Sequence, residues 1–208
     1  MEGAAALGLT VTAATSLMSD AHAATPKKGG LLRLGVDGGA TTDTLDPATF
    51  PSSFIIALNF GGLRTCLTEV DNTGQLVGEL AKSWTASADA KTWTFKLRSG
   101  IEFHNGKTLD AADVVASINH HRGEDSTSAA KSILDAVEDI KADGKDTVVV
   151  TLSGGNADLP FLMSDYHLVI MPAKDGKVVW QSGVGTGGYS LTSFEPGVSA
   201  TAKRNPNY

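Results

Sequence analysis

The sequence predicts an α+β (mixed α/β) fold in which hairpins alternate with short helices. Residues 92–97 alternate between apolar and polar side chains, the period of a strand with one buried face. Asp110 follows where its side chain can cap a helix. Asp143-Gly144, between residues 137–141 and 147–152, is a strong hairpin signal. Because regular strand-helix-strand units do not occur, this pattern favours an α+β architecture.

In the first half of the chain, glycines and prolines separate the expected elements. Apolar runs flanked by glycine are typical of buried strands, and a serine before an apolar run can cap a helix. The elements expected here are a buried strand over 31–36, a helix from Ser52 or Ser53 to Gly61-Gly62, and a hairpin over 63–77 with its turn at 71–74. Leu45-Asp46-Pro47 lies between the strand and the helix as an extended or turn segment.

The second half continues the same alternation. After the strand, turn and helix of residues 84–117, a polar gap at 123–128 separates two groups of elements. The expected elements are a short helix over 129–136, the hairpin of 137–152, a helical turn at 159–163, a strand over 168–171, a glycine-dense loop at 183–189, and antiparallel strands at 190–194 and 199–203. The sequence contains no internal repeat.

Composition and charge exclude several classes of function. The 208 residues have the balanced composition of a globular protein. The formal net charge of -6, without a cluster of Lys and Arg, argues against nucleic-acid binding. Cys66 is the single cysteine, so we expect neither an internal disulfide nor a cysteine-based zinc site.

Residues 1–23 are predicted to be a secretory signal peptide. Residues 4–18 are uncharged and apolar, and Ala21-His22-Ala23 gives the small-x-small pattern that precedes cleavage, expected after Ala23. The run is too short for a membrane span. A basic n-region is missing, so we expect the natural start to lie upstream. Cleavage would remove Glu2 and Asp20 and change the formal charge from -6 to -4. The alternative is an amphipathic first helix of the folded domain.

No motif in the sequence supports catalysis or cofactor binding. Gly183, Gly185 and Gly188 match the spacing of a dinucleotide fingerprint, but a β-rich segment follows where that motif needs a helix N-terminus. We interpret them as a structural loop with positive φ angles. His120 and His121 are adjacent and therefore form a poor chelating pair on a helix. With neither G-x-S-x-G nor H-E-x-x-H present, we expect no catalytic residue, metal site or cofactor.

The aromatic residues leave one question open. Trp84, Trp93, Trp180 and the scattered Phe and Tyr residues mostly occupy strand positions suited to a core. Spacing alone does not show whether one or two of them line a ligand cleft instead.

Two segments carry a resemblance to a known family: Leu80-Ala81-Lys82-Ser83-Trp84 and TWTFKLRSGIEFHNGKTLDAADVVAS at residues 92–117. They resemble the signature of the extracytoplasmic solute-binding proteins of family 5, the oligopeptide, dipeptide and nickel-binding components of ABC transporters. Leu45-Asp46-Pro47, residues 185–189 and Asn205-Pro206-Asn207-Tyr208 fit the same family in the same order. The resemblance covers roughly residues 29–208.

The resemblance implies a periplasmic-binding-protein-like fold with a first lobe and a small inserted domain. Residues 29–56 and 166–208 would form lobe I, and 57–165 the inserted α+β subdomain. Family members are more than twice this length, which implies that the chain is a fragment without the second lobe. Gly188 stands where the family usually has proline, a change expected to loosen the turn.

The resemblance also implies a function and a site. The loop after Leu45-Asp46-Pro47 approaches the ligand in the family, which makes Thr49, Phe50, Pro51 and Ser53 the candidate ligand-binding residues; a purely structural role is the alternative. We expect a monomeric periplasmic protein, not an enzyme, that binds a peptide or similar small solute and delivers it to the ABC permease subunits. The other classes considered are a secreted hydrolase, without the expected nucleophile or metal cluster, and a structural or adhesive envelope protein, without the expected repeats.

Overall fold

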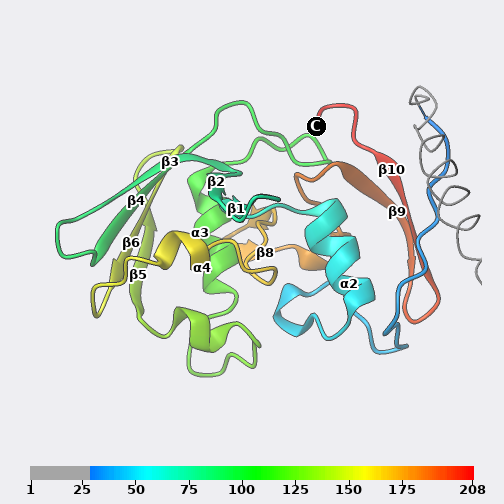
Figure 1. Cartoon of the computed structure of the whole chain (residues 1–208), viewed down its shortest axis with the longest axis horizontal. Helices are drawn as coiled ribbons and strands as arrows, with labels where there is room; N and C mark the ends of the chain where they lie inside the picture. Colours follow the sequence, from blue (N-terminus) through cyan, green and yellow to red (C-terminus); the bar gives the residue numbers. More distant parts are fainter. Residues whose placement is uncertain (1–28) are drawn as a thin grey trace, which may run out of the picture. The chain divides into compact units, whose positions relative to one another are not determined.

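The computed structural model describes residues 29–208 (Figure 1). The predicted signal peptide lies outside the described residues. The chain divides into two units, Met1–Gly35 and Val36–Tyr208. Residues 29–35 contain no helix or strand, and all further elements belong to the second unit.

The largest sheet has four antiparallel strands in the order β3-β4-β6-β5 (Figure 1). These strands are β3 (Ala81–Ala86), β4 (Thr92–Leu97), β5 (Val137–Ala142) and β6 (Thr147–Leu152). Trp93, Phe95 and Leu97 are buried on one face of β4, which confirms the alternation seen in the sequence. The β5–β6 hairpin confirms the turn signal at Asp143-Gly144.

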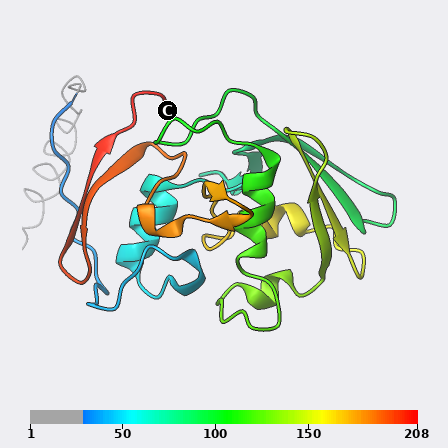
Figure 2. The ribbon, with the colours of Figure 1, turned by 180° about the vertical axis from the view of Figure 1, so that it is seen from behind.

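Helix α3 (Ala111–Asn119) packs between this sheet and a short hairpin of β7 (Ala173–Lys174) and β8 (Lys177–Val178) (Figures 1 and 2). Asp110 caps α3 as predicted, because its carboxylate accepts hydrogen bonds from the backbone N–H groups of Ala112 and Asp113. The Asp113 side chain in turn accepts from the N–H of Asp110 and pairs with Lys107. The start of α3 is therefore held by reciprocal hydrogen bonds between the side chain of each of these two aspartates and the backbone of the other.

The remaining elements are short. Two further antiparallel hairpins, β1–β2 and β9–β10, lie on either side of α2 (Figure 1). Their bounds and those of the other short elements are η1 (Pro47–Thr49), α2 (Ser53–Leu58), the π-turn η2 (Asn59–Leu63), β1 (Thr68–Val70), β2 (Leu76–Gly78), η3 (Lys131–Leu134), α4 (Leu159–Leu162), η4 (Trp180–Ser182), β9 (Tyr189–Glu195) and β10 (Ser199–Arg204).

Three predicted elements differ from the structure. Residues 31–36 are not a buried strand, since no described residue pairs with them and Leu31, Leu32 and Leu34 are exposed. Residues 168–171 are buried but not a strand. The helix expected over 129–136 is a single 3₁₀ turn, η3. In the last two cases the apolar residues reflect burial, which a loop can also provide.

Two separate groups of buried apolar side chains stabilise the second unit. The larger group lies among the four-stranded sheet, α3 and α4, and includes Phe95, Val114 and Leu159. The smaller one centres on Phe50 and Ile55 with other residues near α2. Among the helices of residues 29–208, none has the length and apolar character of a membrane span.

Candidate functional site

The four residues predicted to approach a ligand fall into two groups in the structure. Phe50 is 4% exposed and belongs to the smaller apolar core, with its ring 6.3 Å from that of His167. Thr49, Pro51 and Ser53 are exposed. Ser53 is the first residue of α2, which Ser52 caps. Three of the four are therefore open to solvent, while Phe50 anchors the loop to the core.

The segment before these residues is fixed by its side-chain contacts. Asp46 accepts a hydrogen bond from the N–H of Ala48 at 3.0 Å and pairs with Nε2 of His120 at 2.7 Å. Burial opposes ionisation of Asp46, but the bonds from His120 and Ala48 hold the pKa of its carboxyl below the ordinary value. His120 is the C-cap of α3, so this pair joins the Leu45-Asp46-Pro47 turn to the end of that helix.

A buried guanidinium supports the same segment from behind. Arg64 is 1% exposed and donates to the backbone oxygens of Leu45 at 2.7 Å and Trp180 at 2.8 Å. Burial lowers the pKa of Arg64 to about 9, so the side chain stays cationic at neutral pH. No carboxylate of residues 29–208 lies within salt-bridge distance of it. The sequence pattern did not single out Arg64, because nothing in it marks an arginine as buried.

The histidines form pairwise contacts rather than a metal site. His121 is fully buried, its Nδ1 lies 2.7 Å from the Ser128 hydroxyl, and its Nε2 has no hydrogen-bond partner among the described residues. Burial and the neighbouring His120 and His167 lower the pKa of His121 to about 4. His167 pairs with Asp165 at 2.7 Å. Residues 29–208 contain no cluster of three or more His, Cys, Asp or Glu that could hold a metal ion.

The glycine-dense loop is needed for close packing, and only Gly183 of its four glycines has a positive φ angle, 64°. A side chain at Gly187 would place its Cβ 2.4 Å from the backbone oxygen of Gly62, and one at Gly185 would lie 2.1 Å from that of Leu63. The expectation of positive φ angles throughout this loop is therefore wrong. Strand β9 follows the loop, so no helix N-terminus is present to receive a pyrophosphate.

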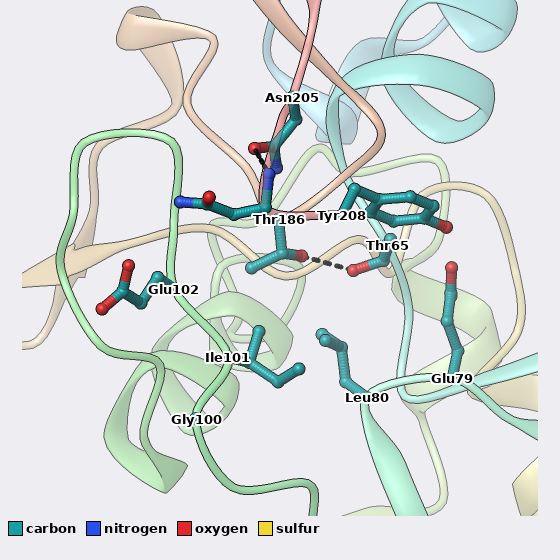
Figure 3. A pocket seen from close by; sticks show the side chains of 10 residues that line it. Thr65, Glu79, Leu80, Gly100, Ile101, Glu102, Thr186, Asn205 and Tyr208 are labelled. Atoms are coloured by element: carbon teal, nitrogen blue, oxygen red, sulfur yellow. Dashed lines mark hydrogen bonds between the residues drawn. The ribbon is translucent and has the colours of Figure 1, made fainter.

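A cavity of about 530 Å³ lies where five segments of the second unit meet (Figure 3). Its polar lining comes from Thr65, Glu79, Glu102, Thr186, Asn205 and Asn207. Leu80, Ile101 and Tyr208 provide apolar surface. The hydroxyls of Thr65 and Thr186 are hydrogen-bonded to each other across it (Figure 3). None of the four residues predicted to approach a ligand lines this cavity.

Glu79 is the ionisable residue of the cavity lining whose pKa burial shifts most. Its Oε2 accepts a hydrogen bond from the backbone N–H of Cys66 at 2.6 Å. Burial raises the pKa of Glu79 to about 7 despite this bond, with a smaller contribution from Glu69. Reasoning from the sequence missed Glu79, since a glutamate beside Leu80 in a strand-forming segment has no distinguishing pattern.

This geometry defines a class of protein: an α+β module with a cavity lined by both polar and apolar side chains. Solved structures show the same fold. AgaA from A. tumefaciens R10, solved with agropinic acid, superposes with a TM-score of 0.70 at 26% identity over 80% of this chain and 34% of its own. DppA from Helicobacter pylori, solved with the peptide STSA, gives a TM-score of 0.71 at 23% identity over 84% and 38%.

The family follows from sequence comparison. The family model described as "Bacterial extracellular solute-binding proteins, family 5 Middle" matches residues 75–208. A Sinorhizobium fredii protein named "Probable peptide ABC transporter periplasmic-binding protein y4tO" is 30% identical over 148 residues, which are 68% of this chain and 28% of that protein. The chain belongs to family 5 of the bacterial extracellular solute-binding proteins. It spans about a third of the length of these relatives.

The fold and family predicted from the sequence are therefore confirmed. Members named among the comparisons bind peptides or other small solutes and work with ABC transporters in the periplasm. They are binding proteins rather than enzymes.

Proposed function

We propose that this chain is part of a periplasmic solute-binding protein that captures a peptide-like solute and delivers it to the permease of an ABC importer. The observation that carries this proposal is the family match over residues 75–208, more than half of the chain. A binding role without enzymatic activity is part of the same proposal, and it rests on the family match and on relatives that are named as binding proteins.

The division into lobe I and an inserted subdomain is part of the same proposal. Two apolar cores support it: the larger core draws most of its residues from 57–165, and the smaller one joins Phe50 and Ile55 to Val169 and Phe194. Export by a signal peptide cleaved after Ala23, and a monomeric state, are also proposed.

The loop of Thr49, Phe50, Pro51 and Ser53 is proposed to face the solute, with Phe50 anchoring it to the smaller core and the other three side chains contacting the solute. The solvent exposure of Thr49, Pro51 and Ser53 is compatible with that role. Arg64 and the His120–Asp46 pair would act as their support, because both hold the preceding turn in place.

Ligand-dependent thermal shift of the full-length parent protein tests the proposal. Peptide pools, nickel chelates and sugars are screened separately, and we expect at least one peptide pool to raise the melting temperature, because a ligand that binds only the folded state stabilises it. If no class of small solute stabilises the intact protein, the transport function is wrong.

A second measurement addresses the site residues. Replacing Thr49 and Ser53 by alanine in the parent should weaken binding of the stabilising solute and lower the melting temperature of the ligand-free protein only slightly, since both side chains are exposed and the hydroxyl of Thr49 makes only solvent-exposed hydrogen bonds to Thr44 and Asp46. Unchanged affinity would show that the loop has only a structural role.

A further inference from the structure

The carboxylate of Glu79 lines the cavity, and no cationic side chain of residues 29–208 forms a salt bridge with it. No Lys, Arg or His is among the residues that line the cavity. Arg98 donates to the backbone oxygens of Glu79 at 2.6 Å and Gly78 at 3.0 Å, which leaves the carboxylate unpaired with a positive charge. The only protein hydrogen bond to the Glu79 side chain among residues 29–208 comes from the N–H of Cys66.

The groups that surround Glu79 make the local potential negative. Glu69 raises the pKa of Glu79, and Glu102 lines the same cavity. Burial raises the pKa of the Tyr208 phenol, with smaller contributions from Glu79 and Glu69. Burial and the same nearby carboxylates keep the Cys66 thiol protonated by raising its pKa. An incoming cation would meet the carboxylates of Glu79 and Glu102, while the guanidinium of Arg98 is held at the backbone oxygens of Glu79 and Gly78 and does not line the cavity.

Apolar surface lies next to this carboxylate. Figure 3 shows the Glu79 side chain next to Leu80, with Ile101 beyond Leu80, and its carboxylate directed toward the hydroxyl end of Tyr208, whereas Glu102 lies on the opposite side of the cavity. An ammonium group at Glu79 could therefore extend an attached aliphatic chain over Leu80 and Ile101.

We propose that this cavity binds the ammonium group of an amine-bearing solute, with the Glu79 carboxylate accepting hydrogen bonds from the ammonium and Leu80 and Ile101 contacting the aliphatic part. This inference rests on the proposed solute-binding function and specifies a chemical class of ligand for a cavity that the predicted loop residues do not line.

The test is a titration of the 208-residue chain, labelled with ¹⁵N, followed by NMR. The probe is n-butylammonium chloride, and n-butanol at the same concentrations is the uncharged control. The backbone amide of Cys66 reports directly on the site, because it donates to Glu79. We expect a saturable shift of this resonance with n-butylammonium, with a dissociation constant of about a millimolar, and no saturation with n-butanol.

Two matched variants distinguish binding of the ammonium at Glu79 from non-specific attraction of a cation to the acidic protein surface. Glu79→Gln keeps the shape and the hydrogen-bond acceptor but removes the charge, so affinity should fall at least about tenfold. Glu102→Gln removes a charge from the opposite side of the same cavity, where exposure screens it, and should weaken binding less than about threefold. Retention of the other amide resonances checks that both variants are folded.

The pH dependence provides a second readout in the unaltered chain. Because a protonated Glu79 must lose its proton before it can pair with an ammonium, affinity should rise about tenfold from pH 6 to pH 8. The residual binding of Glu79→Gln should not change over the same range.

Three results would overturn the inference: no saturable shift at Cys66, equal binding of n-butanol, or equal losses in the two variants. These outcomes differ from failure of the proposed function. If the parent protein binds solutes and Glu79→Gln binds amine-bearing ones as tightly as the unaltered protein, only the inference is wrong. If no solute binds the parent, the function itself is wrong.

Discussion

Arg64 joins three segments that are far apart in the sequence. Its guanidinium donates to Leu45 and Trp180, and its Nε lies 3.4 Å from the oxygen of Val184. A buried charge is costly unless its donors are satisfied, and here backbone oxygens supply the partners. Removing the guanidinium would therefore leave the buried carbonyl of Leu45 and the partly buried carbonyls of Trp180 and Val184 without this donor.

Arg64→Met should therefore lower the free energy of unfolding by about 3 kcal/mol, measured by urea denaturation. Arg98→Met is the matched control, because exposed Arg98 also donates to two backbone oxygens but in contact with water. The free energy of unfolding of Arg98→Met should fall by less than about 1 kcal/mol. Equal losses in the two variants would show that burial of Arg64 has no special energetic role.

His121 should make the protein less stable in acid. Its pKa is about 4 in the folded chain against an ordinary value of 6.5, so between these values the unfolded state binds more protons. The free energy of unfolding should fall by up to about 3 kcal/mol as the pH drops from about 6.5 to about 4. His121→Asn, which does not titrate, should remove this part of the dependence in urea titrations at each pH.

Glu79 changes the pH dependence of stability in the direction opposite to that of His121. Its pKa is raised from 4.5 to about 7, so the folded state binds more protons between these values, and this contribution to stability is lost as the pH rises through 7. In Glu79→Gln, the free energy of unfolding should therefore fall more steeply on acidification, because the effect of His121 is no longer offset. A profile that is the same in the unaltered chain and in both variants would contradict the assignment of either group.

At the scale of elements, the glycine-dense loop is closely packed against the turn after α2. The N–H of Gly187 donates to Leu63 at 2.9 Å, and Nε2 of His104 lies 2.9 Å from the oxygen of Gly187. This loop therefore connects the π-turn η2 with the loop that precedes α3. Contacts of this kind require a residue without a side chain.

Gly187→Ala should lower the free energy of unfolding by about 2 kcal/mol or more, because its Cβ would overlap the oxygen of Gly62 at 2.4 Å. Gly61→Ala, in the π-turn against which Gly187 packs, is the control, since its Cβ would meet no atom within 4 Å. That variant should change stability by less than about 1 kcal/mol. Thermal unfolding followed by circular dichroism measures both, and a neutral Gly187→Ala would contradict the packing argument.

The sequence predicted some elements well because their signals are local. The alternation in β4, the cap at Asp110 and the turn at Asp143-Gly144 each depend on a few neighbouring residues, and all three are confirmed. The prediction of strands at residues 31–36 and 168–171 is wrong. A strand needs a partner, and distant parts of the chain decide whether a partner is available.

At the scale of the whole molecule, the chain spans 28% of the length of its Sinorhizobium fredii relative. The proposed solute-binding function is that of a longer protein of which this chain would be one part, and a surface that contacts only part of a solute binds it weakly. The 208-residue chain should therefore bind peptides far more weakly than the parent protein.

Isothermal titration calorimetry of the 208-residue chain and the parent with the same peptide measures this difference. The chain should show a dissociation constant no tighter than about a millimolar. Micromolar affinity of the chain alone would contradict this prediction, because it would place most of the binding energy within residues 1–208.

The sequence by itself determined the family, the fold class and the strand, turn and helix of residues 84–117, because these depend on local patterns that each segment carries with it. Only the tertiary structure decided that Phe50 is buried, that Arg64 supports the turn before it, and that Thr65, Glu79 and Thr186 share a cavity. The physical reason is that burial and cavities arise where segments distant in the chain pack together, and no local spacing of residues records which segments will meet.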